Sequence, residues 1–369
     1  MISNKAALIA VITAFLVGIV GSLALRPPGA AQTQLADTSE TQSSLRVHWR
    51  MPTAAPSSIP VTGKAPGILR DMISTASNGA VRLDVIEPGE MVPAFAITDA
   101  VRDGKVEAGF TFLGYDQGKI PASALISAVP FGMEPVEFAA WWYSADGKAL
   151  GQELYRSQNA HLILCGVTGP ETAGWFRSPI ESLDDVQGLK IRFAGIGGQV
   201  LEQAGASVTM LPAGEIFQAL EKGAIDASEY ALPIMDQSLG FDRIAKFNYY
   251  PGWHQIFTAT HMVINLDEWN AISSADQMLI ETACTATTME VLSLSEALQG
   301  AVIANFPERG VQAMTLPEPI LRELQTISKQ VLDQNADADP MFAKILASQR
   351  RFLVEYAHWK QLAYLPRDF

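Results

Sequence analysis

Apolar and polar residues alternate over several short segments of the chain, and stretches with helical spacing separate these segments. Residues 81–86 alternate as a strand does, and residues 61–77 predict a helix that ends at Asn78 and Gly79. The rhythm continues to about residue 223, and it predicts an α/β fold on a mainly parallel sheet with helices on both faces. The predicted strands are residues 45–50, 81–86, 106–112, 162–165, 189–193 and 208–211, and the predicted helices are 61–77, 94–104, 198–204 and 213–223.

The last quarter of the chain has a purely helical pattern. Residues 274–304 predict one long helix, with the polar residues 273–276 as its N-terminal cap, and two further helices follow over 317–334 and 339–363. The chain has 369 residues, which is more than a single hydrophobic core usually holds. We therefore expect two lobes.

The N-terminus has the composition of an export signal. Lys5 precedes the mostly apolar residues 6–25, and Arg26 and the small residues 29–31 follow, so residues 1–31 predict a secretory signal peptide. About 20 apolar residues are also enough to span a bilayer, so an uncleaved membrane anchor is the alternative. The polar residues 32–44 predict a flexible tether before an ordered domain over 45–369. Both interpretations place that domain outside the cytoplasm.

Charge and cysteine content narrow the functional class. The formal net charge is −13 and no cluster of lysine and arginine occurs, which excludes nucleic acid as the partner. The chain has only two cysteines, Cys165 and Cys284. An exported protein allows them to form a bridge, but their spacing supplies no geometry, and we expect two buried thiols.

Catalytic motifs are absent from the sequence. It contains no G-x-S-x-G elbow, no H-E-x-x-H, no C-x-x-C and no P-loop, and its five histidines have no ligand spacing. A glycine run at 195–198 follows a predicted strand, but Val200 stands where a dinucleotide-binding loop needs its third glycine. We interpret the run as a strand-to-helix turn that lines a cleft. The sequence thus predicts neither an enzyme nor an organic cofactor.

Several motifs occur in an order that is similar to one known family. The main ones are GVTGPETAGWF at 166–176, LDDVQGLKIR at 183–192 and LEKGAIDASEY at 220–230. The segments 92–104, 129–132, 239–241 and 249–253 fit as well. Over about residues 45–360 the chain resembles the DctP-like solute-binding subunits of TRAP (tripartite ATP-independent periplasmic) transporters.

This resemblance implies a periplasmic, two-lobed α/β receptor of the periplasmic-binding-protein fold. Crossing strands and a long hinge-spanning helix join the lobes, which close on a solute and present it to TRAP membrane subunits. We expect lobe I to comprise about 45–165 with part of 253–369, and lobe II about 166–252 with the remainder. The most similar branch binds 2-oxo or 2-hydroxy carboxylates, often with a metal cation, and can form a homodimer through an extra C-terminal helix. Residues 340–363 are the candidate for that helix.

Arg192 is the first candidate for solute binding. It lies at the end of a predicted strand, before the glycine run, and ligands of open α/β sheets bind beyond the carboxyl ends of strands. Its guanidinium group is a rigid, two-pronged donor that matches a carboxylate. The resemblance gives the arginine at this motif position the same role. The alternative is an arginine in a surface ion pair.

Glu229 and Tyr230 are candidates for a cation site, since they follow the predicted strand 225–228. In the related proteins an acidic residue here, with the backbone carbonyl of the following aromatic residue, helps to hold the cation. Oxygen donors suit hard cations such as sodium or calcium. A carboxylate in solvent is the alternative for Glu229.

Glu171 and Gln255 depart from the 2-oxo-acid pattern. The related proteins have a glutamine at the first position and a glutamate at the second, so the two residues are exchanged here. The exchange keeps the number of carboxylates near the cation unchanged, and we predict that both residues contact it, with Glu171 also near the solute. His254 stands where the relatives have a tryptophan, and residues 114–116 replace an aromatic-rich run.

Three aromatic residues complete the predicted solute pocket: Phe95, Trp175 and Trp253. Packing in the core is the alternative for each of them. The leading interpretation of the whole chain is a transport receptor for a small organic anion. A membrane-tethered sensor of the same fold is the second interpretation, and an exported enzyme is a remote third.

Overall fold

The computed structural model describes residues 44–365. The predicted signal peptide and nearly all of the predicted tether lie outside these residues. Within the described part, no helix is both long enough and apolar enough to cross a membrane.

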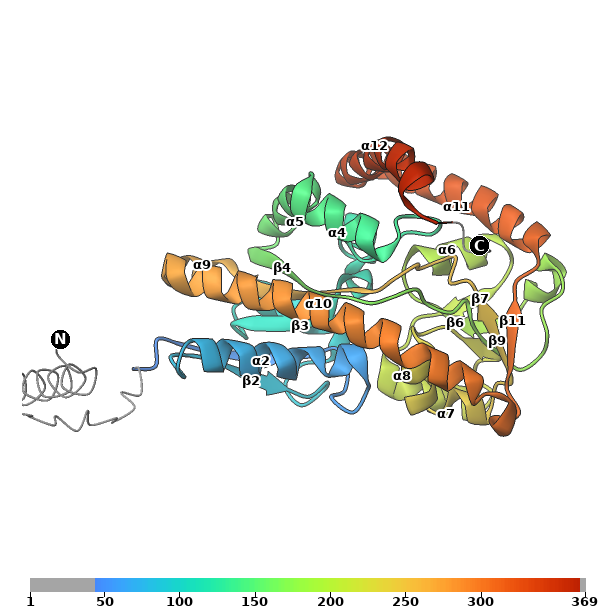
Figure 1. The fold of residues 1–369 in the computed structure, drawn as a ribbon, viewed down its shortest axis with the longest axis horizontal. Helices are drawn as coiled ribbons and strands as arrows, with labels where there is room; N and C mark the ends of the chain where they lie inside the picture. Colours follow the sequence, from blue (N-terminus) through green and yellow to red (C-terminus); the bar gives the residue numbers. More distant parts are fainter. Residues whose placement is uncertain (1–43, 366–369) are drawn as a thin grey trace, which may run out of the picture. The chain divides into compact units, whose positions relative to one another are not determined.

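The described chain alternates strands and helices up to its long C-terminal helices (Figure 1). The strands are β1 (Val47–Pro52), β2 (Val81–Ile86), β3 (Ala108–Phe112), β4 (Ala160–Val167), β5 (Gly174–Phe176), β6 (Lys190–Arg192), β7 (Ser207–Thr209), β8 (Ala227–Ser228), β9 (Phe247–Tyr250), β10 (Ala259–Asn265) and β11 (Gln312–Thr315). The helices are α2 (Ala65–Ala76), α3 (Ile97–Arg102), α4 (Pro135–Ser144), α5 (Gly147–Arg156), α6 (Gly195–Gln203), α7 (Ala213–Glu221), α8 (Pro233–Ser238), α9 (Leu266–Ala271), α10 (Ser274–Ala304), α11 (Glu318–Ala338) and α12 (Pro340–Ala363).

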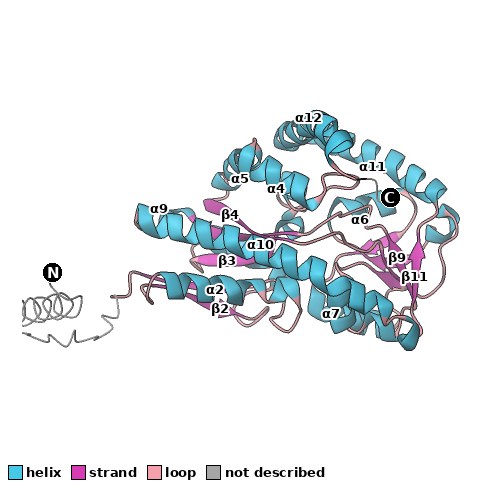
Figure 2. Ribbon diagram, in the orientation of Figure 1, coloured by secondary structure: helices cyan, strands magenta, loops and turns pink. Residues whose placement is uncertain are grey.

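The strands form three separate sheets, so the expectation of one mainly parallel sheet is wrong. The sheets have the orders β1-β2, β3-β10-β4 and β11-β9-β5-β8-β6-β7. Strand β10, which starts at Ala259, runs antiparallel to both β3 and β4, which end at Phe112 and Val167. Local alternation cannot encode that pairing, because it depends on the return of a distant segment. Figure 2 shows the strands in two groups, with β2, β3 and β4 apart from β9 and β11.

Helix α10 connects these two groups of elements, as expected for a hinge-spanning helix. It starts where the pattern predicts, because the side chain of Ser273 accepts a hydrogen bond of 3.1 Å from the backbone N–H of Asp276. Ile280, Cys284 and Val291 lie along its buried side. The helix packs on β4 and α2 and also on α8, so it contacts both groups.

A disulfide bonds this helix to the three-stranded sheet β3-β10-β4. Cys165 in β4 and Cys284 in α10 are bonded, with their Cα atoms 4.2 Å apart, so the expectation of two free thiols is wrong. The two residues are 119 positions apart in sequence. They meet only because α10 lies on β4, and both are fully buried there. The exported location that the sequence predicts suits such a bond.

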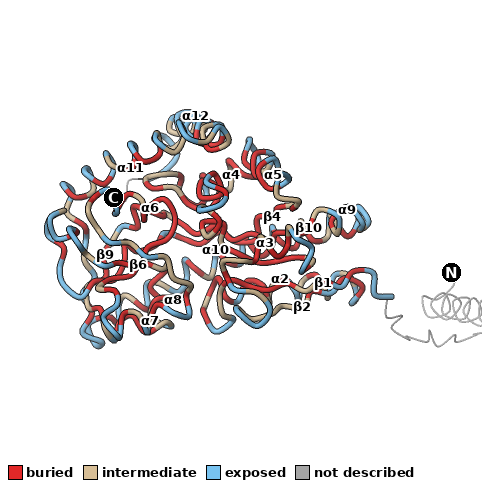
Figure 3. Tube along the Cα trace, turned by 180° about the vertical axis from the view of Figure 1, so that it is seen from behind, coloured by how far each residue is buried: buried red, intermediate tan, exposed pale blue. Residues whose placement is uncertain are grey.

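The two C-terminal helices cover different parts of the domain. Helix α11 packs on α6, and α12 packs on α4 and α5, where Trp141 Nε1 of α4 donates a hydrogen bond of 3.0 Å to Ser348 Oγ of α12. Figure 3 shows exposed turns along the outer side of both helices, whereas most strands are buried. The outer side of α12 carries apolar residues that no other described element covers: Val354 is 68% exposed and Trp359 61%.

Candidate functional site

The candidate site lies where two parallel strands of the six-stranded sheet end. Strands β6 and β8 pair in parallel with Arg192 opposite Ser228, so Arg192 and the next residue after Ser228 reach the same edge of the sheet. That next residue is Glu229. The strand-end argument from the sequence therefore places both side chains together, at the edge where open α/β sheets bind ligands.

Arg192 is held rigidly at this edge and is only 1% exposed. Its Nη1 donates a hydrogen bond of 2.8 Å to Glu229 Oε2 and one of 2.6 Å to the backbone oxygen of Glu229. Its Nε donates to the backbone oxygen of Leu211 at 3.1 Å. The ring of Tyr230 lies 5.5 Å from the guanidinium carbon, within cation–π range. These contacts hold the positively charged guanidinium of Arg192 in position without a solute.

Glu171 comes from the segment after β4 and is 2% exposed. Its Oε1 accepts hydrogen bonds from Thr258 Oγ1, from Thr168 Oγ1 at 3.3 Å and from Gln255 Nε2 at 3.4 Å. Its Oε2 is buried and has no hydrogen-bond partner. Burial, and then the charge of Glu229, raise the pKa of Glu171 well above its usual range. The free oxygen lacks the partner that a buried carboxylate needs.

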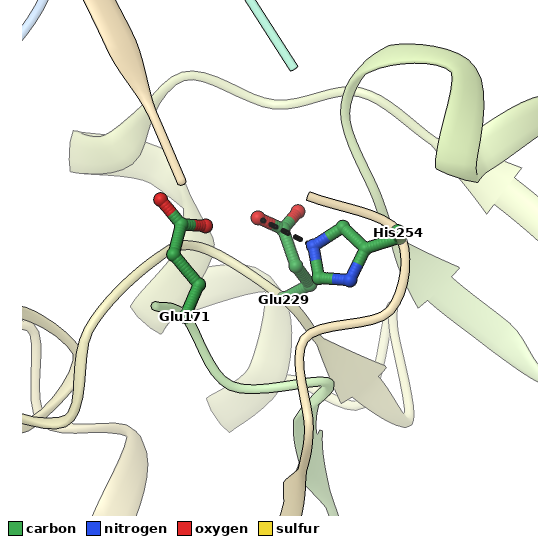
Figure 4. Close-up of side chains that lie close together, drawn as sticks. All are labelled: Glu171, Glu229 and His254. Atoms are coloured by element: carbon green, nitrogen blue, oxygen red, sulfur yellow. Dashed lines mark ion pairs between the residues drawn. The ribbon is translucent and has the colours of Figure 1, made fainter. Parts of the chain in front are cut away.

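His254 completes a group of three buried residues with Glu171 and Glu229 (Figure 4). One ligand atom from each of the three lies within 4.8 Å of the others, and His254 Nε2 is 3.5 Å from Glu229 Oε1. Neither ring nitrogen of His254 has a hydrogen-bond partner, and Glu229 Oε1 has none either. Each residue thus offers an unsatisfied, buried atom to a common point. Such a set fits a metal cation, because buried polar atoms without partners are costly.

A small cavity of about 40 Å³ opens beside these groups. Arg192, Glu229, Tyr230 and Gln255 line its polar end. The rest of the lining consists of apolar residues and threonines of both groups of elements, and it includes Thr53, Ala54, Pro66, Phe110, Phe112, Met235, Thr258 and Thr260. The arrangement can hold one small anion whose charged end meets Arg192.

The predicted site residues fall into two sets. Arg192, Glu229, Tyr230 and Gln255 line the cavity, and Glu171 is hydrogen-bonded to Gln255 directly behind the lining. The other set comprises the three aromatic residues predicted to line the pocket, and none of them is part of this lining.

Each of these aromatic residues contacts the protein interior instead. Trp175 packs 5.5 Å from the ring of Phe306, and its Nε1 donates a hydrogen bond of 2.8 Å to Asp236. Trp253 stacks 6.2 Å from Phe193, and Phe95 lies edge-on to Tyr115 at 4.7 Å. Trp175 and Trp253 are at most 4% exposed, whereas Phe95 is half-buried. For Trp175 in β5, alternation along the strand cannot tell which of two buried faces the side chain meets.

Sequence reasoning gave no role to His254 or to the threonines at 53, 258 and 260. The departure from the family pattern marked His254, and that was the available signal for it. The threonines come from two distant segments, one directly after β1 and one at the start of β10, so only the fold brings them to one cavity.

Comparison with known proteins agrees with this geometry. The sequence model of the bacterial extracellular solute-binding proteins of family 7 (DctP) matches residues 52–339. The chain belongs to this family. It is 34% identical over 327 residues, 88% of this chain and 90% of the relative, to a monocarboxylate 2-oxoacid-binding periplasmic protein of Nostoc sp.. Membership makes it a periplasmic solute-binding protein of a TRAP transport system and not an enzyme.

Solved structures of the family are similar over most of the chain. A TRAP solute-binding protein of Bordetella bronchiseptica, a dimer with copurified calcium and picolinate, is 29% identical with a TM-score of 0.85, covering 87% of this chain and 95% of that one. One from Pseudoalteromonas atlantica with bound sodium and pyruvate is 28% identical with a TM-score of 0.83, covering 86% and 97%. The predicted family and two-lobed fold are confirmed.

Proposed function

We propose that the protein captures a short 2-oxo or 2-hydroxy monocarboxylate together with a metal cation. The observation that carries the proposal is the buried guanidinium of Arg192 at the cavity, next to unsatisfied oxygens of Glu171 and Glu229. Nε and Nη1 of this guanidinium already donate to Leu211 and Glu229, so Nη2 is the nitrogen left to donate a charge-assisted hydrogen bond to the solute carboxylate. The cation then takes the solute's second oxygen, which a 2-oxo or 2-hydroxy acid carries next to its carboxylate.

The lining favours one carboxylate on a short, apolar solute. Arg192 is the one arginine in this lining, and the described residues place no lysine there. A second carboxylate on the solute would be desolvated against Ala54, Phe110 or Met235 without a positive partner. Pyruvate, which a related structure holds, has the expected size and charge.

The cation site of the proposal comprises Glu171, Glu229, Gln255 and the backbone carbonyl of Tyr230. Sodium or calcium occupies related structures, and oxygen donors of this kind suit either ion. A bound cation offsets the repulsion between Glu171 and Glu229 and gives each free oxygen a partner. The cation also coordinates the 2-oxo or 2-hydroxy oxygen of the solute, which Arg192 does not contact.

In this proposal two lobes close on the solute. The chain passes from lobe I to lobe II near residue 165 and leaves lobe II near residue 253. Arg192 and Glu229 belong to lobe II, whereas Thr53, Phe110 and Phe112 belong to lobe I, so the cavity takes its lining from both. Closure around a ligand is the usual response of receptors built in this way. The closed form then presents the solute to TRAP membrane subunits.

A homodimer through α12 is the proposed assembly. Val354, Trp359 and Leu362 are 68%, 61% and 88% exposed on this helix, which is a large apolar surface for a solvated face. The related Bordetella protein is a dimer, which supports an interface between two copies.

Calorimetry on the chelator-treated protein tests the proposal. Pyruvate and 2-oxobutyrate should bind once sodium or calcium is restored, and 2-oxoglutarate should bind far more weakly because its second carboxylate lacks a partner. Acetate, which lacks the 2-oxo group, is the matched control for the role of the cation. Equal affinities for pyruvate and 2-oxoglutarate, or binding of pyruvate that ignores cations, would contradict the proposal.

A further inference from the structure

We infer that His254 is a metal ligand and that the site selects a borderline divalent ion of the zinc type over sodium or calcium. The inference rests on the proposed function in one respect, since it assigns the cation of the same cavity. It concerns this chain's own departure at position 254, where an imidazole faces the two carboxylates (Figure 4).

The donor atoms point to this class of metal. Sodium and calcium are hard cations that take oxygen ligands, whereas an imidazole nitrogen suits zinc, cobalt, nickel or copper. His254 Nε2 is buried, has no hydrogen-bond partner and lies 3.5 Å from Glu229 Oε1. A tetrahedral zinc ion with bonds of about 2.1 Å holds its ligand atoms about 3.4 Å apart. The histidine–glutamate pair therefore already has the required spacing.

The local charge favours a divalent ion. Glu171, Glu229 and Arg192 are at most 2% exposed and together carry one net negative charge when ionised. A divalent ion and one solute carboxylate bring the buried total to zero, whereas a monovalent ion leaves one negative charge unpaired. Buried charges are tolerated when they are paired, so neutrality favours the divalent ion.

The protein holds the imidazole in place from several sides. Its ring packs edge-on against Phe193 at 4.5 Å and against Trp253 at 5.6 Å. Gly197 makes room for it, because a Cβ at that position would lie 2.6 Å from His254 Cβ. The remaining oxygens of both carboxylates are also engaged, Glu229 Oε2 by Arg192 and Glu171 Oε1 by Thr258. The three free atoms are left for the ion.

The ligand set has an open position. Three protein ligands leave room for the solute on a four- or five-coordinate ion, as in zinc sites that bind exchangeable ligands. The three ligand atoms lie within 4.8 Å of one another, so the widest pair closes by up to about 1.4 Å to reach the ~3.4 Å spacing of a tetrahedral zinc ion. Side-chain rotation of Glu171 supplies a movement of this size.

The test is competitive metal titration of the full-length, chelator-treated protein with zinc, calcium and sodium chloride. We expect one zinc ion per chain, bound about 100-fold or more tightly than calcium, and His254→Gln to lose about 10- to 100-fold in zinc affinity while calcium affinity changes little. His261→Gln is the matched control, since His261 is also fully buried with both ring nitrogens unpartnered. It should keep the zinc affinity of the wild type.

Nuclear magnetic resonance of the histidine ring nitrogens needs no variant and covers the case that His254→Gln does not fold. Zinc should shift one Nε2 resonance in the wild type, with no bound proton on that atom. Calcium binding as tightly as zinc, unchanged zinc affinity in a folded His254→Gln protein, or ring nitrogens unmoved by zinc would overturn the inference. If pyruvate binds with sodium or calcium in those cases, the proposed function stands alone. Zinc bound through His254 without any binding of 2-oxo acids would instead overturn the proposed function.

Discussion

Replacement of Arg192 by alanine is the most direct test of the solute site. The change removes the only arginine of the cavity lining and, with it, the two hydrogen bonds of 2.6 and 2.8 Å to Glu229. Within residues 44–365, Glu229 Oε2 then keeps one hydrogen-bond donor, the backbone N–H of Ala194 at 3.3 Å. A buried carboxylate loses its counter-charge, so we expect the unliganded protein to lose about 3–5 kcal/mol of its free energy of unfolding.

The expected loss of solute binding is separate from this loss of stability. Truncating one partner of a buried, hydrogen-bonded charge pair costs about 2–5 kcal/mol of binding free energy. At 1.4 kcal/mol per factor of ten, that is about a 30- to 4,000-fold weaker affinity for pyruvate. Lysine at this position should recover little, because one ammonium group cannot replace the hydrogen bonds to Leu211 and Glu229 and also donate to the solute.

Isothermal calorimetry with pyruvate and urea denaturation without solute measure the two effects independently. The double variant Arg192→Ala with Glu229→Gln removes the uncompensated charge, so it should regain stability but not affinity. Arg322→Ala, which breaks an exposed ion pair with Glu318, is the control for loss of an arginine and should change neither quantity. A pyruvate affinity within about 3-fold of wild type in Arg192→Ala would refute the carboxylate role, since the expected loss is at least tenfold larger.

Three further predictions concern the cation pair, the disulfide and a buried acid. Glu171→Gln should weaken cation and solute binding, and adding Gln255→Glu should restore much of it, with a coupling energy of about 0.5–3 kcal/mol in a double-mutant cycle; simple additivity would mean that the exchange has no functional meaning. Replacing both Cys165 and Cys284 by alanine should cost about 2–5 kcal/mol in urea denaturation, and an unchanged midpoint would contradict the stabilising role of the bond. Burial raises the pKa of Asp116 from its ordinary value of 3.8 to about 6, so the folded state holds the proton more tightly than the unfolded chain. Stability should therefore fall by roughly 3 kcal/mol as the pH rises from about 4 to 6, an effect that Asp116→Asn should abolish in denaturation series at each pH.

Family, export and the main helices can be read from the sequence because their signals are local. Residues 81–86 and 274–304 have the predicted limits, since side-chain alternation and the Ser273 cap act within a few residues. Arg192 and Glu229 were also predictable. Each follows its own strand directly, and parallel strands bring their carboxyl ends to one edge.

The helix at the glycine run shows where local rules stop. The pattern predicts a helix from residue 198, but α6 starts at Gly195, and the glycines in its first turn allow the close approach of His254. That approach involves a residue more than fifty positions away. A propensity rule, which ranks glycine low in helices, has no access to it.

Tertiary structure alone decided what the remaining residues do. In the fold, β10 pairs between β3 and β4, Cys165 is bonded to Cys284, and Trp175 packs on Phe306 and not in the cavity lining. The fold also brings His254 within reach of both glutamates. Sequence patterns record which side chains are apolar and where elements begin and end. The partner of a buried side chain depends on how distant elements pack, and that is settled only by the complete fold.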